Sequence, residues 1–168
     1  LRLFYLAEKG DGMNDILITG SRGFIGTAIR NEIKHPYDEV DLKDGKNHKD
    51  ISGRTGMLIH LSAWVQQNES FKCPVKYIQN NFLDLATLIE NNKFDSIVFP
   101  STSCVYDRHG NLEPVSPYGL SKLAAEKLIR IYIKKHWILR FMNPYGKNDD
   151  RSIFYLLSQC KKQNKTFQ

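Results

Sequence analysis

The sequence lacks the long apolar run that a membrane-spanning helix requires. About 18 to 20 apolar residues are needed to cross a bilayer, whereas the longest hydrophobic stretches in this 168-residue chain are strand-sized pieces such as 96–100. Cysteine is also scarce, since the chain contains only Cys73, Cys104 and Cys160. These cysteines lie far apart and form no CxxC pair, which argues against a disulfide framework and a zinc site. We therefore expect a cytoplasmic protein that is not embedded in a membrane.

Ligand-spaced histidines and clustered charges are missing as well. The five histidines show no HExxH or similar spacing, so no metal site is predicted. Lys and Arg outnumber Asp and Glu by 24 to 18, but apart from short groups at 134–135 and 161–165 the basic residues are scattered. No aromatic residues interleave a basic stripe, and the net charge of +6 therefore does not predict a nucleic-acid partner.

The composition that is present, 41% hydrophobic and 25% charged, is typical of one globular domain. A chain of this length buries about 70% of the surface that its unfolded form exposes, so it can build a core without metals or disulfides. The apolar patch within residues 1–12 is too short for a signal-peptide core. We expect residues 1–12 to be an N-terminal extension, and residues 13–168 to be a domain that is truncated at its C-terminal end.

Short apolar runs alternate with longer segments of helical periodicity, a pattern typical of βα units and a parallel sheet. Strands are expected at 15–19, 39–42, 57–61, 96–100 and 137–141. Helices are expected between 24 and Pro36, between Pro74 and Asn91, over about 118–134, and from about 151. The predicted fold class is α/β, a doubly wound, Rossmann-like parallel sheet with helices on both faces.

A glycine-rich turn, Thr19-Gly-Ser-Arg-Gly-Phe-Ile-Gly26, joins the first expected strand to the first expected helix. Glycines at these positions let the backbone approach a pyrophosphate, which the N–H groups of the helix N-terminus can bind. The turn therefore predicts a dinucleotide site. Asp41 follows the last glycine by 15 residues, where a carboxylate would bind an adenosine ribose and repel a 2′-phosphate, favouring NAD over NADP. The alternative is that Asp41 is a solvated carboxylate.

A second pattern, Tyr118-Gly-Leu-Ser-Lys122, places a phenol and an ammonium group on one face of a helix. The ammonium group would favour the ionised phenol, whose ordinary pKa of about 10 makes it a poor base near neutrality. Tyr118 could then exchange a proton with a sugar or alcohol hydroxyl while a nicotinamide exchanges a hydride. By itself the pattern would fit two exposed helix residues, but hydroxyl residues 101–103 follow the fourth expected strand, where open α/β sheets bind ligands.

These motifs, in this order, resemble the extended short-chain dehydrogenase/reductase family, in its NAD-dependent nucleotide-sugar epimerase/dehydratase branch. The resemblance spans about residues 15–168 and rests on the glycine-rich turn and on 50–51, 60–63, 80–81, 101–106, 116–126 and 139–146. Members of this family are longer and place most of the sugar-nucleotide pocket in a C-terminal part, which is largely missing here. They often form homodimers, so a homodimer is a further expectation.

Carried over to matching positions, the resemblance implies a cofactor site and a catalytic site. The cofactor would be bound by Gly20, Gly23, Phe24, Ile25 and Gly26 at the pyrophosphate, Asp41 at the adenosine ribose, Asp50 and Ile51 at the adenine, Leu61, Ala63 and Asn81 along the groove, and Tyr118 and Lys122 near the nicotinamide. The catalytic residues would be Thr102, which binds the substrate oxygen, Tyr118, the acid/base, and Lys122, which holds the nicotinamide ribose and tunes Tyr118. Asn143 would join Thr102 in the substrate site. For Asn81 and Asn143 the alternative is a structural turn or cap.

The resemblance disfavours a dehydratase, because Ser103 and Cys104 stand where dehydratases of this branch carry acidic residues. This pair and Arg22 resemble GDP-fucose synthase, in which the equivalent cysteine takes part in epimerisation, so Cys104 is either a proton carrier or a packed residue. We expect an NAD-dependent nucleotide-sugar epimerase or a related reductase that acts by tyrosine-assisted hydride transfer. The alternative is an inactive or truncated dinucleotide-binding module that acts through partners.

Overall fold

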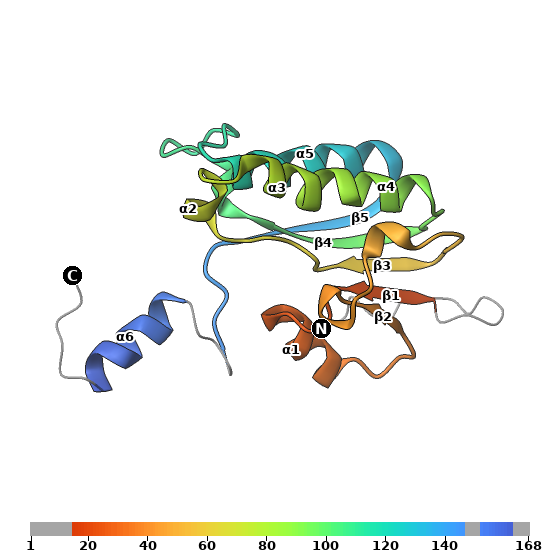
Figure 1. The fold of residues 1–168 in the computed structure, drawn as a ribbon, viewed down its shortest axis with the longest axis horizontal. Coiled ribbons are helices and arrows are strands. Elements are labelled where there is room, and N and C mark those ends of the chain that lie inside the picture. Colours follow the sequence, from red (N-terminus) through yellow and green to blue (C-terminus); the bar gives the residue numbers. More distant parts are fainter. Residues whose placement is uncertain (1–14, 147–151, 163–168) are drawn as a thin grey trace.

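A parallel sheet of five strands forms the centre of the structure (Figure 1). The computed structural model describes residues 15–146 and 152–162, so the expected extension over residues 1–12 lies outside the described part. The strands lie in the order β2-β1-β3-β4-β5, and all neighbours are parallel. Their bounds are β1 (Ile16–Thr19), β2 (Asp38–Val40), β3 (Met57–His60), β4 (Ser96–Thr102) and β5 (Lys135–Phe141).

Helices cover both faces of this sheet, which confirms the predicted doubly wound α/β class. One face is covered by α1 (Phe24–Glu32), and the opposite face by α3 (Pro74–Ile78), α4 (Asp84–Glu90) and α5 (Pro117–Tyr132), as Figure 1 shows. The strand order reverses at β1, which has β2 on one side and β3 on the other. In open α/β sheets a crevice opens beyond the carboxyl ends of the strands at such a switch point.

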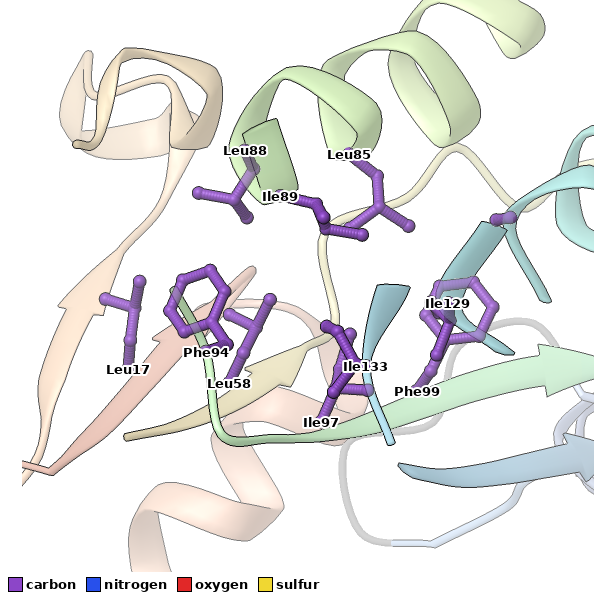
Figure 2. Close-up of a cluster of buried hydrophobic side chains, with 11 residues drawn as sticks. Leu17, Leu58, Leu85, Leu88, Ile89, Phe94, Ile97, Phe99, Ile129 and Ile133 are labelled. Carbon is purple, nitrogen blue, oxygen red and sulfur yellow. The ribbon is translucent and has the colours of Figure 1, made fainter. Parts of the chain in front are cut away.

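Apolar side chains hold these layers together. On one face Leu85 and Leu88 of α4 and Ile129 of α5 pack over sheet residues that include Leu58 and Ile97 (Figure 2). On the other face a second cluster joins α1 to alternate residues of β1 and β3. Because successive strand residues point to opposite faces, strands buried on both faces must be apolar throughout, as β1 and β3 largely are.

Local sequence explains where α5 begins. Ser116 caps this helix by accepting a hydrogen bond from the N–H of Gly119 over 3.1 Å, and Pro117 occupies the first helical position, where its missing N–H costs nothing. The sixteen-residue helix ends at Tyr132, close to the predicted bounds of 118–134. This start matters for the site, because it places Tyr118 in the first turn of α5.

The segment between Pro74 and Asn91 differs from the single helix that its apolar spacing predicts. It consists of α3, a π-helical turn η4 (Gln79–Leu83), and α4. The short helix α2 (Gln67–Ser70) is not predicted by the sequence pattern. The other short elements are the 3-10 turns η2 (Leu42–Asp44), η3 (His48–Asp50) and η5 (Ser103–Val105), and α6 (Ile153–Lys162) is the last helix. Within the described residues, none of the helices has the length and apolar character needed to span a membrane.

Candidate active site

A cleft of about 530 Å³ lies beyond the carboxyl ends of β1, β3, β4 and β5. Its volume is in the range of small-molecule sites. Most of the residues that the sequence motifs predicted for the site line this cleft. They are Gly20, Gly23, Phe24, Ile25, Gly26, Leu61, Ala63, Thr102, Tyr118, Lys122 and Asn143. The tertiary structure therefore brings the glycine-rich turn and the Tyr118-to-Lys122 motif to one cavity.

Two glycines of the turn are required by close backbone contacts. At Gly20, which has a φ of +69°, a Cβ atom would lie 2.6 Å from the backbone nitrogen of Ser62. At Gly26 a Cβ atom would lie 2.4 Å from the carbonyl oxygen of Gly20. These positions let the end of β1 approach the chain beyond β3 and let α1 pack directly on the turn. The turn is thus drawn into a tight shape that opens toward the cleft.

The N-terminus of α1 is suited to an anion. Its N-cap residue, Gly23, supplies no side-chain cap, and the first turn contains no acidic residue. Uncapped N–H groups and the positive end of the helix dipole therefore remain for a ligand at a terminus whose first residues line the cleft. The hydroxyl of Ser21, buried in the same turn, has no hydrogen-bond partner. This arrangement fits the pyrophosphate of a dinucleotide.

Asp41 lies beside the turn but does not line the cleft. Its carboxylate, only 7% exposed, accepts hydrogen bonds from the backbone N–H groups of Arg22 at 2.8 Å and Lys43 at 2.9 Å. It therefore ties the glycine-rich turn to the end of β2 and is not a solvated carboxylate. The side chains of the same two residues have other partners, since Arg22 pairs with Asp44 at 2.5 Å and the ammonium of Lys43 donates to the carbonyl of Arg22. Its contact with a ribose stays a prediction.

Three other predicted cofactor residues are not among those that line the cleft. Asp50 is exposed in η3, and Ile51 packs at the edge of the apolar core. Asn81 is buried, and its amide bonds both the N–H and the carbonyl of Trp64 and the hydroxyl of Ser121. Those contacts favour the structural alternative for Asn81, because they fasten the segment after β3 to α5. Roles for these residues at the cofactor stay predictions.

Tyr118 and Lys122 are buried in the cleft wall, and burial dominates their protonation. It raises the pKa of Tyr118 to about 12, while a hydrogen bond with Thr102 acts in the opposite direction. It lowers the pKa of Lys122 to about 7, and the charge of Glu126 opposes that shift. The Lys122 ammonium lies 3.9 Å from the centre of the Phe99 ring. The motif predicted a lowered pKa for Tyr118, but the structure raises it, because desolvation disfavours the phenolate.

Gln67 and Glu126 were not predicted as site residues, and Cys104 was left open between a proton carrier and a packed residue. The Cys104 thiol donates to the side-chain oxygen of Gln67 over 3.4 Å, and both side chains line the cleft. Gln67 begins α2, which the sequence pattern did not reveal. Glu126, by contrast, follows Lys122 by four residues, a spacing that places it on the same helix face and could have identified it. Within the described ranges, no cluster of three or more His, Cys, Asp or Glu side chains could hold a metal ion.

Two buried histidines lie behind the glycine-rich turn. The Nδ1 atom of His60, at the end of β3, lies 2.8 Å from the hydroxyl of Thr19 at the end of β1. The rings of His48 and His60 meet edge to face with centroids 5.0 Å apart, and the Nε2 atom of each has no hydrogen-bond partner. Burial lowers the pKa of both histidines below the ordinary value of 6.5. Burial therefore favours the neutral form of both rings in the folded chain.

We expect acid to destabilise the fold through these two histidines. At pH values below 6.5, the ordinary histidine pKa, the unfolded chain binds more protons on these rings than the folded chain does. The free energy of unfolding therefore falls as the pH falls. The free energy of unfolding should fall between about pH 6.5 and 5.5, by at most about 1 kcal/mol for each histidine that stays neutral in the folded chain, and urea denaturation measures this loss. His48→Gln should reduce this dependence, whereas His35→Gln, at an exposed position, should leave it unchanged. A stability that is flat over this range would contradict the assignment.

Comparison with protein families identifies the cleft-bearing part of the chain. The profile of the NAD dependent epimerase/dehydratase family matches residues 16–167. The UDP-glucose 4-epimerase of Lacticaseibacillus casei is 33% identical over 154 residues, which cover 83% of this chain and 45% of that protein. The enzyme of the same name from Streptococcus mutans is 30% identical over 173 residues, covering 88% and 49%. This chain thus spans about half the length of the curated relatives that it matches.

Solved structures show the same architecture. The dTDP-4-dehydrorhamnose reductase of Bacillus anthracis, in complex with NADP, superposes with a TM-score of 0.72 at 19% identity, covering 92% of this chain and 62% of that one. MoeE5, in complex with UDP-glucose and NAD, superposes with a TM-score of 0.69 at 26% identity, covering 87% and 60%. The similarity to the reductase, at 19% identity, shows the fold alone. MoeE5 is more similar in sequence and was solved with a nucleotide sugar and NAD.

Proposed function

Because the chain belongs to the NAD dependent epimerase/dehydratase family, we propose that it binds NAD in the cleft and is a nucleotide-sugar epimerase or a related reductase. One observation carries this proposal. The cleft places the anion-ready N-terminus of α1 in the same cavity as Thr102, Tyr118 and Lys122. Dinucleotide binding alone would explain the N-terminus of α1. The phenol of Tyr118, the ammonium group of Lys122 and the hydroxyl of Thr102 in the same cavity are suited to proton transfer as well.

In this mechanism NAD, when bound, supplies the hydride acceptor for a sugar carbon. The glycine-rich turn and the N-terminus of α1 would hold its pyrophosphate, and Lys122 its nicotinamide ribose. Tyr118 would move the proton at the sugar oxygen, and Thr102 would position that oxygen by a hydrogen bond. The walls of the cleft bury Tyr118 and Lys122 and so exclude water from the proton-transfer site.

An epimerase is favoured over a reductase because Asp41 beside the turn fits NAD, which such a reaction regenerates within each cycle. UDP-glucose is the first substrate to test, since relatives include UDP-glucose 4-epimerases and MoeE5 was solved with UDP-glucose. A dinucleotide-binding module that acts through partners is the second candidate. The observation that favours it is the burial of Tyr118, which raises its pKa to about 12 and so disfavours the phenolate that would accept a proton.

The first experiment is calorimetric titration of the chain with NAD and NADP. We expect NAD to bind more tightly, and Asp41→Ala to weaken its binding about tenfold, a loss of about 1.4 kcal/mol, because the carboxylate no longer ties the turn to β2. Asp44→Ala is the matched control, since Asp44 makes an exposed ion pair with Arg22 in the same region, and it should change the affinity little. Absence of binding by a folded chain would refute the proposal. Tighter binding of NADP than of NAD would mean that Arg22 and Lys43 attract the 2′-phosphate and that Asp41 does not set a preference for NAD.

Two finer proposals concern the setting of the protein. A cytoplasmic location is supported by three cysteines that are free thiols, as a reducing compartment keeps them; fractionation of the cells that express the chain would test it.

A homodimer is supported by the outer surface of α5, where Leu120, Ile131 and Tyr132 are exposed, since exposed apolar patches often mark interfaces. Sedimentation would measure the mass in solution.

A further inference from the structure

Glu126 is a buried carboxylate that extends the row of ionisable side chains on α5. It follows Lys122 by four residues and Tyr118 by eight, so the three share one face of the helix. Lys122 is 3% exposed and Glu126 only 1%. A charged group so deeply buried is stable only with partners that repay its desolvation, and these partners indicate what Glu126 does.

Both oxygens of the Glu126 carboxylate are bound by residues at the carboxyl ends of two strands. The hydroxyl of Ser101 on β4 donates to Oε1 over 2.5 Å. Arg140 on β5 donates from Nε to Oε1 over 3.0 Å and from Nη2 to Oε2 over 2.5 Å. Arg140 also lies over the ring of Tyr106 and donates to its hydroxyl. Since Ser101 precedes Thr102, the carboxylate fastens α5 to the strand end that carries Thr102.

The same carboxylate is the acidic neighbour of Lys122. The charges of His60 on β3 and Glu126 on α5 interact with that of Lys122. Cys104 in η5 and Tyr118 on α5 line the same cleft, and Arg140 on β5 is paired with Glu126. Among these groups, Glu126 carries the negative charge that favours a protonated lysine, and it opposes the burial that lowers the lysine pKa to about 7. The ion pair with Arg140 neutralises part of that charge.

We propose that Glu126 is a positioning residue for the proton transfer at Tyr118: it holds α5 in register with Thr102 and places a buried negative charge on the helix face that carries Lys122. This role rests on the proposed function, because it lies within the same site. Arg140 moderates the effect of that charge, since its guanidinium is paired with the same carboxylate. The ion pair thus sets how strongly the cleft holds a positive charge beside the phenol.

The titration of Lys122 by NMR, in a chain made with isotope-labelled lysine, tests the proposal without cofactor or substrate. Glu126→Gln keeps the size of the side chain and one acceptor oxygen but removes the charge. We expect the midpoint of the Lys122 titration to fall by about one pH unit, since an opposite charge nearby in a buried site is worth about that much or more. Lys122→Arg assigns the resonance. An unchanged midpoint in a folded Glu126→Gln chain overturns the proposal.

Arg140→Gln provides a second variant with the opposite expected sign. Arg140 is partly exposed, and its loss frees the Glu126 charge to act on Lys122, so the midpoint should rise. Should Glu126→Gln fail to fold, this variant decides by itself, and a midpoint that stays or falls overturns the proposal. Ser101→Ala is the matched structural control, because it removes a tie to β4 without removing a charge. Its midpoint should stay at the wild-type value.

Turnover supplies a readout that a purely structural role would not move. In Glu126→Gln the alkaline limb of the pH profile of kcat should shift to lower pH by the same amount as the lysine midpoint. In Ser101→Ala kcat should fall while that limb stays in place. A lower kcat in Glu126→Gln with an unmoved limb would assign Glu126 a structural role alone and overturn the proposal. Failure of the proposed function is seen separately, in the NAD titration.

Discussion

Replacing Tyr118 by phenylalanine is expected to lower kcat with a nucleotide sugar about a thousandfold, which is within the usual range for a general acid–base group. The change removes one hydroxyl and keeps the ring, which packs edge to face against Tyr77 with centroids 6.2 Å apart. The shape of the cleft is therefore retained. Affinity for NAD should stay within a factor of about two, since the pyrophosphate is held by the turn and by α1.

The measurement is a steady-state assay of the purified chain with UDP-glucose, together with calorimetry for NAD. Tyr132→Phe is the matched control, because Tyr132 lies on the same helix with 66% of its surface exposed, and it should keep the wild-type kcat. Equal kcat values for Tyr118→Phe and the wild-type chain would remove Tyr118 from the mechanism. A chain that binds NAD but turns over no nucleotide sugar would favour the dinucleotide-binding module.

Replacing Gly20 by alanine is expected to have the largest effect on the fold. The added methyl group would lie 2.6 Å from the nitrogen of Ser62 and 2.7 Å from the carbonyl carbon of Leu61, and both are backbone atoms that cannot turn away. The φ of +69° adds the strain of a left-handed residue. We expect the free energy of unfolding to fall by about 3 kcal/mol and NAD binding to be lost, because the turn must shift away from β3.

Gly45→Ala separates these two causes. Gly45 has a φ of +71°, nearly that of Gly20, but a Cβ atom there would meet nothing within 4 Å. Its substitution should therefore cost only the left-handed strain, about 1 kcal/mol, and should leave NAD binding unchanged. Urea denaturation and calorimetry measure both quantities. Similar losses in the two variants would mean that the contact with the chain after β3 is unimportant.

The sequence pattern predicted the architecture because the signals involved are local. Uninterrupted apolar runs distinguish strands buried on both faces, and Pro36 limits how far the first helix can extend, which the structure ends at Glu32. The pattern also predicted one helix across 74–90, where the structure contains a π-helical turn. Apolar spacings of three and four residues do not reveal one extra residue in a turn, since the insertion is stabilised by packing and by contacts such as those of Asn81.

The sequence also predicted some features of the candidate site correctly and others not. Glycine spacing indicated Gly20 and Gly26, because only backbone sterics decide there. Asp41 was predicted from its distance along the chain and its place at the end of the second expected strand. Neither reveals that its carboxylate accepts hydrogen bonds from the backbone N–H groups of Arg22 and Lys43. The pKa of Tyr118 was expected to be lowered by Lys122, but burial raises it to about 12. A helical spacing states which side chains are neighbours, and it does not state how much water surrounds them.

The sequence by itself determined the order of strands and helices, the phosphate-type turn and the presence of a phenol and an ammonium group on one helix face. These features depend on neighbours within a few residues, whose geometry the backbone restricts. Only the tertiary structure decided that the turn and this helix meet in one cleft, that Glu126 reaches Ser101 and Arg140 across two strands, and that the site is dry enough to shift its pKa values. Those outcomes depend on burial and on contacts between residues far apart in the chain, which no local pattern encodes.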